Sequence, residues 1–363
     1  MQESFYKGKK VLVTGHTGFK GTWLCKMLLA QGADVVGYAL QPPTNPNLFS
    51  IVGMEKQMQS IIGDIRDFVL LQDTFRIYQP EIVFHLAAQP LVRESYVTPR
   101  DTYEINVMGS VNVLECIRQT DSVKSFLNVT TDKVYKNKEW EWGYREYEEL
   151  DGHDPYSNSK SCSELVTHSY KSSFFDNADR KVALSTVRAG NVIGGGDFAD
   201  NRIIPDCLRA IENESDIIIR NPYSVRPYQH VLEALHAYLI IAQQQYEQLD
   251  KAGWYNIGPD EKDCISTGKL VRMFCEKWNE KTGKRAAWRV TEADGPHEAK
   301  LLKLDCSKAK SVFGWHPTWD VAAAVEKIIE WYGYYSSGKD VNEIMDKQIR
   351  KFYCDFIERK EYV

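Results

Sequence analysis

The sequence predicts an α/β protein in which a doubly wound parallel sheet is joined to a smaller, mixed α/β lobe. Apolar, strand-like runs alternate with helix-like segments through the first half of the chain. One of these runs, residues 81–88, is almost continuously apolar, which is typical of parallel strands buried on both faces. Repeated strand–helix units imply right-handed crossovers and helices on both faces of one sheet.

Local patterns place the individual elements. Short runs rich in β-branched and aromatic residues predict strands at residues 11–13, 34–40, 59–63, 81–88, 124–130 and 181–188. Apolar residues at helical spacing predict helices after Gly21, over 68–78, over about 101–119 and from 155 to about 175. A proline-containing loop (residues 41–46) and a charged, aromatic loop (136–154) separate some of these elements.

The alternation breaks after Arg188, where residues 191–201 form a glycine-rich loop. Later elements are shorter and mixed. Residues 234–248 nevertheless predict a helix, and residues 254–257 predict a strand that returns to the first sheet. Apolar residues at helical spacing over 341–358 predict a helix that packs against the core.

Two domains are expected from this pattern. The first comprises residues 1–190 and 230–258, and the second lobe comprises residues 191–229 and 259–363. In open parallel sheets, ligands bind beyond the carboxyl ends of the strands. The second lobe is therefore expected to close over that edge and to hold the substrate.

The composition excludes several classes of protein. Hydrophobic residues make up 43% of the 363 residues and charged residues 26%, which is ordinary for a globular chain. The formal net charge is −5, no basic stripe suggests nucleic acid, and no apolar segment approaches the ~18 residues that cross a membrane. The 8 cysteines form neither a CxxC pair nor a cluster with histidine, so we expect reduced thiols, no metal site and a cytoplasmic location.

The first candidate site is the segment KKVLVTGHTGFKG, residues 9–21, which predicts a strand, a glycine turn and a helix. Gly15, Gly18 and Gly21 let backbone N–H groups approach a pyrophosphate at a helix N-terminus, where the helix dipole favours negative charge. The spacing is GxxGxxG rather than GxGxxG, and a tight turn without a ligand gives the same pattern.

The second motif is Tyr156-Ser-Asn-Ser-Lys160, at the start of a predicted helix. Positions i and i+4 share a helix face. An ammonium group beside a tyrosine favours the phenolate, so we expect the pKa of Tyr156 to fall from about 10 towards working pH. Tyr156 is then a candidate base for a hydroxyl proton, and Lys160 can also reach a ribose hydroxyl.

The third motif, TTDKVY, spans residues 130–135 at the end of the predicted fifth strand. A glycine turn, a strand-end hydroxyl and YxxxK in this order resemble the extended short-chain dehydrogenase/reductase family over essentially the whole chain. The resemblance implies a Rossmann-type fold, and it matches Thr131 to the hydroxyl that hydrogen-bonds the reacting sugar oxygen. It also implies cofactor contacts at Gly15, Thr17, Gly18, Phe19, Lys20, Gly21, Asp64, Ile65, Leu86, Ala87, Ala88, Thr130, Tyr156 and Lys160.

Within that family, the residues after the hydroxyl distinguish the sugar-nucleotide enzymes. Epimerases usually carry small residues there, whereas 4,6-dehydratases carry an acid, generally Asp-Glu. This chain has Asp132 followed by Lys133. It is similar to the dehydratases that act on CDP-glucose in the segments GHTGFKG, TNPNLF, AAQPLVRESY, AGNVIGGGDFADNRIIPD and VRPYQHVLEAL.

The resemblance implies the conversion of CDP-glucose to CDP-4-keto-6-deoxyglucose and water, in deoxysugar (lipopolysaccharide O-antigen type) biosynthesis. Hydride passes from C4 to NAD and then to C6, and Tyr156 takes the proton of the C4 hydroxyl. The 4-keto group acidifies the C5 proton, and the C6 hydroxyl leaves. Asp132 is the expected acid for that hydroxyl, and Lys133 can serve as the C5 base only where desolvation favours its neutral form.

The cofactor and substrate contacts follow from charge. Neither an acid for a ribose 2′-hydroxyl nor an arginine for a 2′-phosphate stands at residues 37–41, and with the resemblance the absence of arginine over 37–55 favours NAD. The resemblance implies that Arg202 and Arg226 of the second lobe lie near the sugar nucleotide, where they suit the diphosphate because arginine binds phosphate bidentately. The resemblance adds Gln89, Asn191 and His297 as substrate contacts.

Other functions stay open at this point. They are a C4-epimerase or a decarboxylase of the same fold, a 4,6-dehydratase for another nucleotide sugar, and a non-catalytic NAD-sensing regulator. Such regulators often lose the catalytic tyrosine, whereas Tyr156, Lys160 and Thr131 are all present. The family pairs its subunits through helices near 101–119 and 155–175, so a homodimer or a dimer of dimers is expected.

Overall fold

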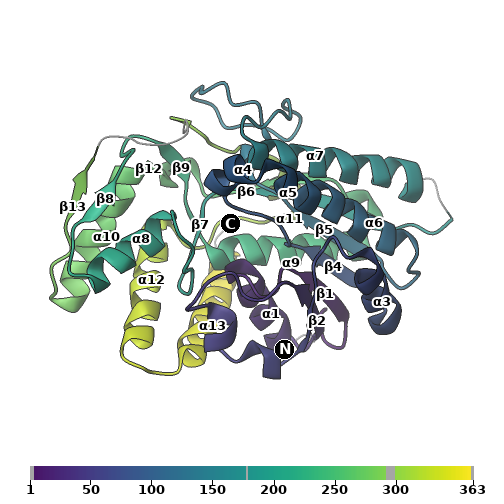
Figure 1. Cartoon of the computed structure of the whole chain (residues 1–363), viewed down its shortest axis with the longest axis horizontal. Coiled ribbons are helices and arrows are strands. Elements are labelled where there is room, and N and C mark those ends of the chain that lie inside the picture. Colours follow the sequence, from purple (N-terminus) through teal and green to yellow (C-terminus); the bar gives the residue numbers. More distant parts are fainter. Residues whose placement is uncertain (1–3, 177–178, 292–298, 361–363) are drawn as a thin grey trace.

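The computed structural model describes residues 4–176, 179–291 and 299–360. At its centre is a seven-stranded sheet in the order β11-β6-β5-β4-β1-β2-β3, in which all neighbouring strands are parallel (Figure 1). These strands are β1 (Lys10–Thr14), β2 (Asp34–Ala39), β3 (Gln59–Ile62), β4 (Ile82–His85), β5 (Ser125–Val129), β6 (Ala183–Ala189) and β11 (Trp254–Ile257).

Five of the predicted helical segments lie around the sheet, together with two short helices at residues 48–51 and 92–97 that the sequence patterns do not predict. They are α1 (Phe19–Ala30), α2 (Leu48–Ile51), α3 (Phe68–Tyr78), α4 (Val92–Val97), α5 (Pro99–Tyr103), α6 (Gly109–Arg118), α7 (Pro155–Tyr170) and α9 (Val231–Glu247). Between α5 and α6 the helix continues as a π-helical turn, η2 (Glu104–Met108), and α7 continues into a second π-helical turn, η4 (Lys171–Phe175).

Alternate residues of the strands pack on opposite faces of the sheet, as parallel strands buried on both sides require. Val11 and Val13 of β1 pack in one cluster, which includes residues of α1 and α9. Leu12 of the same strand packs in the other cluster, which includes residues of α3 and α6. Both faces are thus closed to water, and the carboxyl ends of the strands are left as the place for a ligand.

Helix α9 reaches the sheet after a detour of the chain through the second lobe. The side chain of Gln245, fully buried in α9, donates to Ser125 Oγ at 2.8 Å and to the Phe126 carbonyl at 3.0 Å. Strand β11 then joins the edge of the sheet beside β6. Strand β11, the last in sequence of the seven strands of this sheet, therefore completes a sheet that begins with β1 near the N-terminus.

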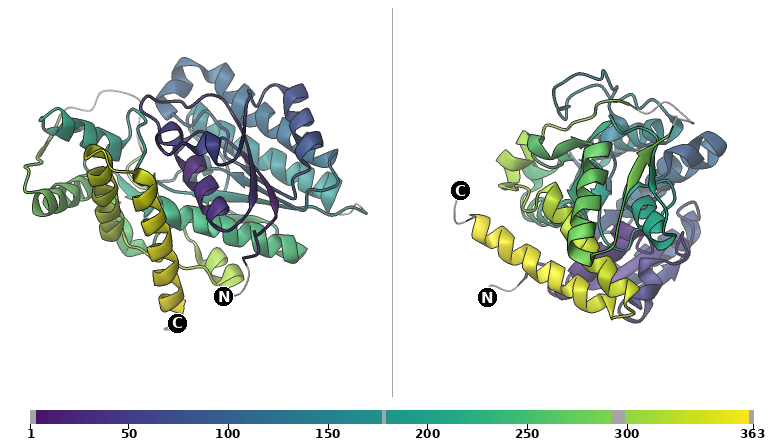
Figure 2. Two further views of the ribbon diagram at one scale, coloured as in Figure 1. Left: turned by 90° about the horizontal axis from the view of Figure 1, so that it is seen from below. Right: turned by 90° about the vertical axis from the view of Figure 1, so that its left-hand side faces the viewer.

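The remaining elements are short strands and helices. Three two-stranded sheets pair β7 (Val192–Ile193) with β10 (Gln229–His230), β9 (Val225–Pro227) with β12 (Cys264–Ser266), and β8 (Ile217–Ile219) with β13 (Trp288–Val290). The helices are α8 (Ile203–Glu212), α10 (Thr267–Thr282), α11 (Ser307–Phe313), α12 (Val321–Ser336) and α13 (Val341–Lys360). Figure 2 shows α12 and α13 side by side at one end of the molecule.

Two C-terminal helices also contact the first part of the chain. Helix α11 packs against β11 and α9. Lys26 of α1 binds Asp346 of α13 at 3.0 Å. Among the helices of the described residues, none combines the length and the apolar character needed to span a membrane.

Candidate active site

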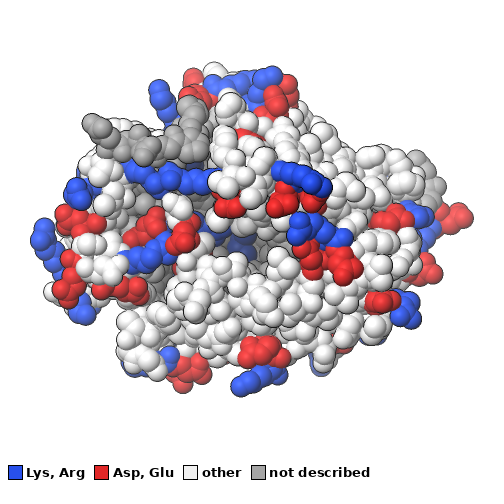
Figure 3. Space-filling model, viewed as in Figure 1, with Lys and Arg blue, Asp and Glu red and all other residues white. Residues whose placement is uncertain are grey.

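A cavity of about 1320 Å³ lies at the carboxyl ends of the strands, between the sheet and the short elements of the second lobe. Figure 3 shows this face of the molecule hollowed at its centre, with Lys and Arg side chains in the hollow. The cavity brings together residues that are far apart in sequence: Phe19, Lys20, Thr130, Thr131, Asp132, Lys133, Tyr156, Asn191, Arg202 and Arg226 all line it. His297 lies outside the described residues.

The glycine turn holds three backbone segments in close contact. Gly15 has φ +76°, and a Cβ there would lie 2.7 Å from the backbone nitrogen of Ala87. At Gly21 a Cβ would lie 2.1 Å from the Gly15 carbonyl oxygen. Gly18, which precedes α1, has its nearest such neighbour at 3.5 Å, so the space in front of the helix N-terminus is more open. This arrangement leaves room for a pyrophosphate at the start of a helix of 12 residues.

Other predicted cofactor residues surround this turn. Thr17 donates its hydroxyl to the Leu40 carbonyl at 2.9 Å, which fixes the turn to the end of β2. Backbone N–H groups of Leu86 and Ala87 donate to Thr14. Asp64 binds the Arg66 guanidinium at 2.7 Å, which lowers the pKa of its carboxyl, while Ile65 is buried against Gly109.

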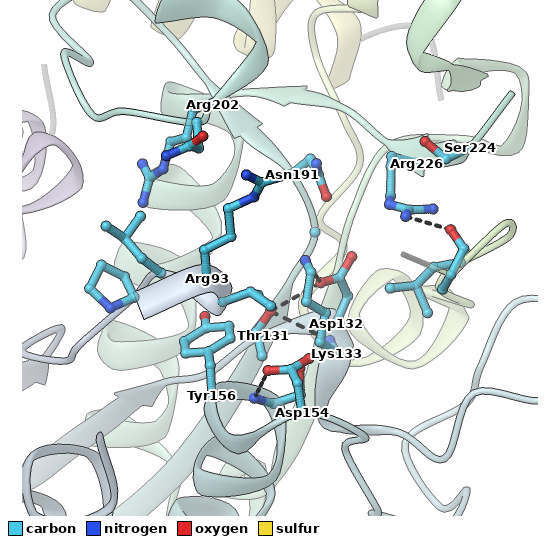
Figure 4. A pocket seen from close by; sticks show the side chains of 18 of the residues that line it. Arg93, Thr131, Asp132, Lys133, Asp154, Tyr156, Asn191, Arg202, Ser224 and Arg226 are labelled. Carbon is cyan, nitrogen blue, oxygen red and sulfur yellow. Dashed lines mark hydrogen bonds and ion pairs between the residues drawn. The ribbon is translucent and has the colours of Figure 1, made fainter. Parts of the chain in front are cut away.

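Thr131 and Tyr156 lie side by side at the cavity wall (Figure 4), and hydrogen bonding from the Thr131 hydroxyl favours the phenolate and so lowers the pKa of Tyr156. Tyr156 is the second residue of α7. The N-cap of this helix is Asp154, whose carboxylate accepts a hydrogen bond from the backbone N–H of Ser157 at 2.9 Å. Burial raises the pKa of Tyr156 to about 12, and the bond with Thr131 opposes this shift only in part. The predicted fall of the pKa is therefore wrong for the protein without ligands, because desolvation of the phenolate outweighs the favourable contacts.

Lys160 lies one helical turn below Tyr156 and is 4% exposed. Its ammonium group donates to the Val129 carbonyl at 3.2 Å. Burial lowers the pKa of Lys160 to about 7, the nearby charge of Lys20 lowers it further, and Glu164 opposes both. Lys160 does not line the cavity wall, whereas Tyr156, on the preceding turn of α7, does.

Asp132 and Lys133 form a hydrogen-bonded ion pair beside Thr131. Asp132 is fully buried; its Oδ1 accepts from the Thr131 hydroxyl at 3.0 Å and from Lys133 Nζ at 3.2 Å. Its Oδ2 is buried without a hydrogen-bond partner, whereas the Lys133 side chain is 33% exposed. A carboxyl oxygen of this kind, in a cavity wall, is available to a ligand.

A buried ion pair lies next to the TTDKVY and YxxxK motifs. Glu164 of α7 binds the Arg188 guanidinium through both oxygens, at 2.8 and 2.6 Å, and both residues are at most 1% exposed. The same carboxylate accepts from the Thr130 hydroxyl at 2.5 Å. Burial alone raises the pKa of the Glu164 carboxyl, but Arg188 and the Thr130 hydroxyl outweigh burial and lower it. The pair thus connects α7 with the ends of β5 and β6.

Replacing Glu164 with glutamine is expected to destabilise the protein by about 3 kcal/mol or more, because the Arg188 charge stays buried without its partner. Urea-induced unfolding measures the loss. Combining Glu164→Gln with Arg188→Met removes both charges and is expected to recover most of it. A loss below about 1 kcal/mol in the single variant contradicts the assignment of a buried ion pair.

The predicted substrate residues have different surroundings. Arg202, just before α8, donates to Asp197 at 3.0 Å. Arg226 of β9 is held by the backbone carbonyls of Val225 at 2.9 Å and Ala299 at 2.6 Å. Asn191 follows β6, and its buried Oδ1 has no hydrogen-bond partner.

Gln89 and Arg93 differ from what their sequence context indicates. The Gln89 side chain does not line the cavity; its amide group is hydrogen-bonded within the turn that precedes α4. Arg93, which the motif analysis does not single out, extends into the cavity (Figure 4). In the sequence, Arg93 is marked only as a cationic residue four positions after Gln89 in the segment AAQPLVRESY.

Comparison with protein families gives a match over residues 12–328 to the family described as GDP-mannose 4,6 dehydratase. A CDP-glucose 4,6-dehydratase of Salmonella typhimurium is 50% identical over 346 residues, which cover 94% of this chain and 95% of that protein. A CDP-paratose 2-epimerase of Salmonella typhi is 26% identical, with 89% of this chain and 98% of that protein covered.

Solved structures share the fold. A dTDP-glucose 4,6-dehydratase of Bacillus anthracis in complex with NAD has a TM-score of 0.74 at 19% identity, covering 92% of this chain and 99% of that chain. A UDP-glucose-4-epimerase of Stenotrophomonas maltophila with bound NAD has a TM-score of 0.77 at 21% identity, covering 91% and 99%.

Proposed function

Because the chain belongs to the GDP-mannose 4,6 dehydratase family, we propose that it removes water from CDP-glucose to give CDP-4-keto-6-deoxyglucose. The observation that carries this proposal is Asp132, a buried carboxyl group with one oxygen unpartnered in the cavity wall, beside the Thr131–Tyr156 pair. Epimerisation at C4 needs no acid at a leaving hydroxyl, whereas elimination of the C6 hydroxyl does. The product belongs to the deoxysugar class, which supports a role in the synthesis of such sugars.

NAD is the cofactor that this site suits. The close backbone contacts at Gly15 and Gly21, with the open space at Gly18, fit a dinucleotide diphosphate in front of α1. Lys20, Thr130, Leu86 and Ala88 are further proposed contacts, and Tyr156 with Lys160 would hold the ribose beside the nicotinamide. Bound there, NAD would supply the hydride acceptor for C4 of the sugar and, once reduced, the hydride donor for C6.

The protein residues move the protons. Tyr156, hydrogen-bonded to Thr131, accepts the proton of the C4 hydroxyl, and the Lys160 ammonium favours the phenolate that this step requires. Asp132 donates a proton to the departing C6 hydroxyl, and Lys133 takes the C5 proton. Both steps require the neutral form of the pair, in which the proton has passed from Lys133 Nζ to Asp132 Oδ1, 3.2 Å away, before the two side chains act in the cavity that they line.

The second lobe is proposed to bind the rest of the substrate. Its segments are residues 191–229 and 259–363, while residues 1–190 and 230–258 form the cofactor domain. Arg202 and Arg226 are the proposed diphosphate ligands. Arg226 suits this role because backbone carbonyls hold its guanidinium while no carboxylate is bound to it in the part of the chain that the structure describes.

The test is an assay of the purified protein with NAD and CDP-glucose, read as the alkali-induced absorbance of a 4-keto sugar. dTDP-, UDP- and GDP-sugars serve as a panel for base specificity. A dehydratase produces the signal with CDP-glucose, an epimerase produces an epimeric hexose without it, and an NAD-sensing regulator turns over none of the sugars.

A homodimer, or a dimer of such dimers, is proposed to form through the helices near 101–119 (α5, η2 and α6) and 155–175 (α7 and η4). These elements expose large apolar side chains: Met108, Leu165 and Phe174 are 45–53% exposed. Sedimentation velocity at micromolar concentration is expected to show the dimer, and Leu165→Glu is expected to weaken it. Ile77→Glu on α3, an equally exposed position elsewhere, is the control; a monomeric wild-type protein contradicts the proposal.

All 8 cysteines are free thiols, and five of them are buried. Free thiols persist in reducing compartments. Since nucleotide sugars are also made in the cytoplasm, we assign the protein to that compartment as part of the same proposal.

A further inference from the structure

Arg93 stands on a turn that hydrogen bonds fix on several sides. Gln89 Oε1 accepts the Leu91 N–H at 2.5 Å, and Gln89 Nε2 donates to the Leu91 carbonyl at 3.1 Å and to Thr102 Oγ1 at 3.0 Å. Asn106 of η2 accepts from the Gln89 N–H at 2.9 Å and donates to the Gln89 carbonyl at 3.1 Å. The start of α4 is therefore attached to α5 and η2, and the Arg93 side chain leaves from a rigid base.

The Arg93 side chain crosses the cavity from the sheet side. In Figure 4 it lies between Tyr156, at the reacting end, and Arg202, and its guanidinium group points toward Asn191. Arg202 and Arg226 enter the same cavity from the second lobe, before α8 and in β9. Arg93 thus supplies positive charge from the first domain, on the opposite side of the substrate path.

The surroundings favour an anionic ligand for this group. Lys20, Arg202 and Arg226 line the same cavity, so an anionic ligand there offsets the repulsion between these cations and Arg93. The Arg93 guanidinium supplies N–H donors and no acceptor, which suits phosphate oxygens better than sugar hydroxyls, because a hydroxyl also has a proton to donate.

The order of groups along a nucleotide sugar then identifies the phosphate. With C4 at Tyr156, C1 points away from the reacting end, and the next charged group is the phosphate attached to C1. The geometry points to Arg93 as the ligand of this sugar-side phosphate, with Arg202 and Arg226 left for the remainder of the diphosphate. This inference rests on the proposed function, since it takes a nucleotide sugar as the substrate.

Calorimetric titration of the full-length protein with CDP and with CMP tests it. CDP carries both phosphates, whereas CMP lacks the one that the sugar would bear. Arg93→Met is expected to bind CDP about 10- to 100-fold more weakly and to bind CMP as the wild type does, because a charge-assisted pair to a phosphate is lost. Arg93→Lys, which keeps the charge but not the bidentate geometry, is expected to lie between the two.

Arg76→Met is the matched control, since Arg76 is exposed on α3, away from the cavity, and its guanidinium binds Asp73 on the same helix. Equal weakening of CDP and CMP, or unchanged CDP binding, overturns the inference. If Arg93→Met does not fold, Arg93→Gln takes its place under the same criteria. Turnover of CDP-glucose by the wild type is a separate result: its absence overturns the proposed function, whereas unchanged CDP binding in an active enzyme overturns only the assignment of Arg93.

Discussion

Replacing Tyr156 with phenylalanine is expected to lower kcat for CDP-glucose by about 10²- to 10⁴-fold, the usual contribution of a positioned acid–base group. The substitution keeps the aromatic ring and removes the hydroxyl that is hydrogen-bonded to Thr131. Because binding of the substrate diphosphate depends on other residues, KM is expected to change much less than kcat. Initial rates of 4-keto sugar formation measure both constants.

Tyr170→Phe is the control for this variant. Tyr170 lies on the same helix, α7, but does not line the cavity, so its loss is expected to leave kcat unchanged. Binding of NAD, measured by calorimetry, should be retained in both variants. If Tyr156→Phe kept most of its activity, Tyr156 would not be the base for the C4 hydroxyl.

Asp132→Asn and Lys133→Met are expected to affect different steps, each by about 10²-fold or more. Asp132→Asn removes the acid for the C6 hydroxyl, so dehydration slows while exchange of the C5 proton continues. Lys133→Met removes the C5 base, so both exchange and dehydration slow. The exchange is measured as deuterium uptake from solvent at C5 of the 4-keto-6-deoxy sugar, and dehydration is measured as product formation.

The exchange measurement also separates two roles of Lys133. Either Lys133 removes the C5 proton, or it only stabilises the enolate as a fixed positive charge while a different group removes the proton. Normal exchange at C5 in Lys133→Met then rules out Lys133 as the base. Lys138→Met is a useful control, because Lys138 also lines the cavity but its ammonium group lies over the Trp140 ring, 4.6 Å from the ring centroid.

Much of the sheet was predictable because each central strand is an apolar run between polar turns. β4 and β5 are buried at every position, and such runs are distinct from the amphipathic pattern of α3. The strands of the second lobe were not predictable in this way. β7 and β10 have two residues each, too few to show any period, and their positions depend on contacts between distant segments.

Site residues were predictable where a motif fixes them on one element. Tyr156 and Lys160 share a face of α7, and Thr131 follows two residues after the end of β5. The pKa of Tyr156 was not predictable, because its direction depends on burial of the side chain in the folded protein and not on the spacing to Lys160. Arg93 was missed for a related reason: its orientation depends on the hydrogen bonds of Gln89, which connect three separate segments.

The late return of α9 and β11 to the sheet has a consequence for biosynthesis. As the chain leaves the ribosome, β1 to β6 emerge before the helix that covers one of their faces. The Ser125 hydroxyl and the Phe126 carbonyl can form their hydrogen bonds with Gln245 only after more than a hundred further residues have been synthesised. Nascent chains that end near residue 190 expose an uncovered apolar surface, the kind of surface that chaperones bind. Completion of the sheet is therefore tied to synthesis of the first segment of the second lobe.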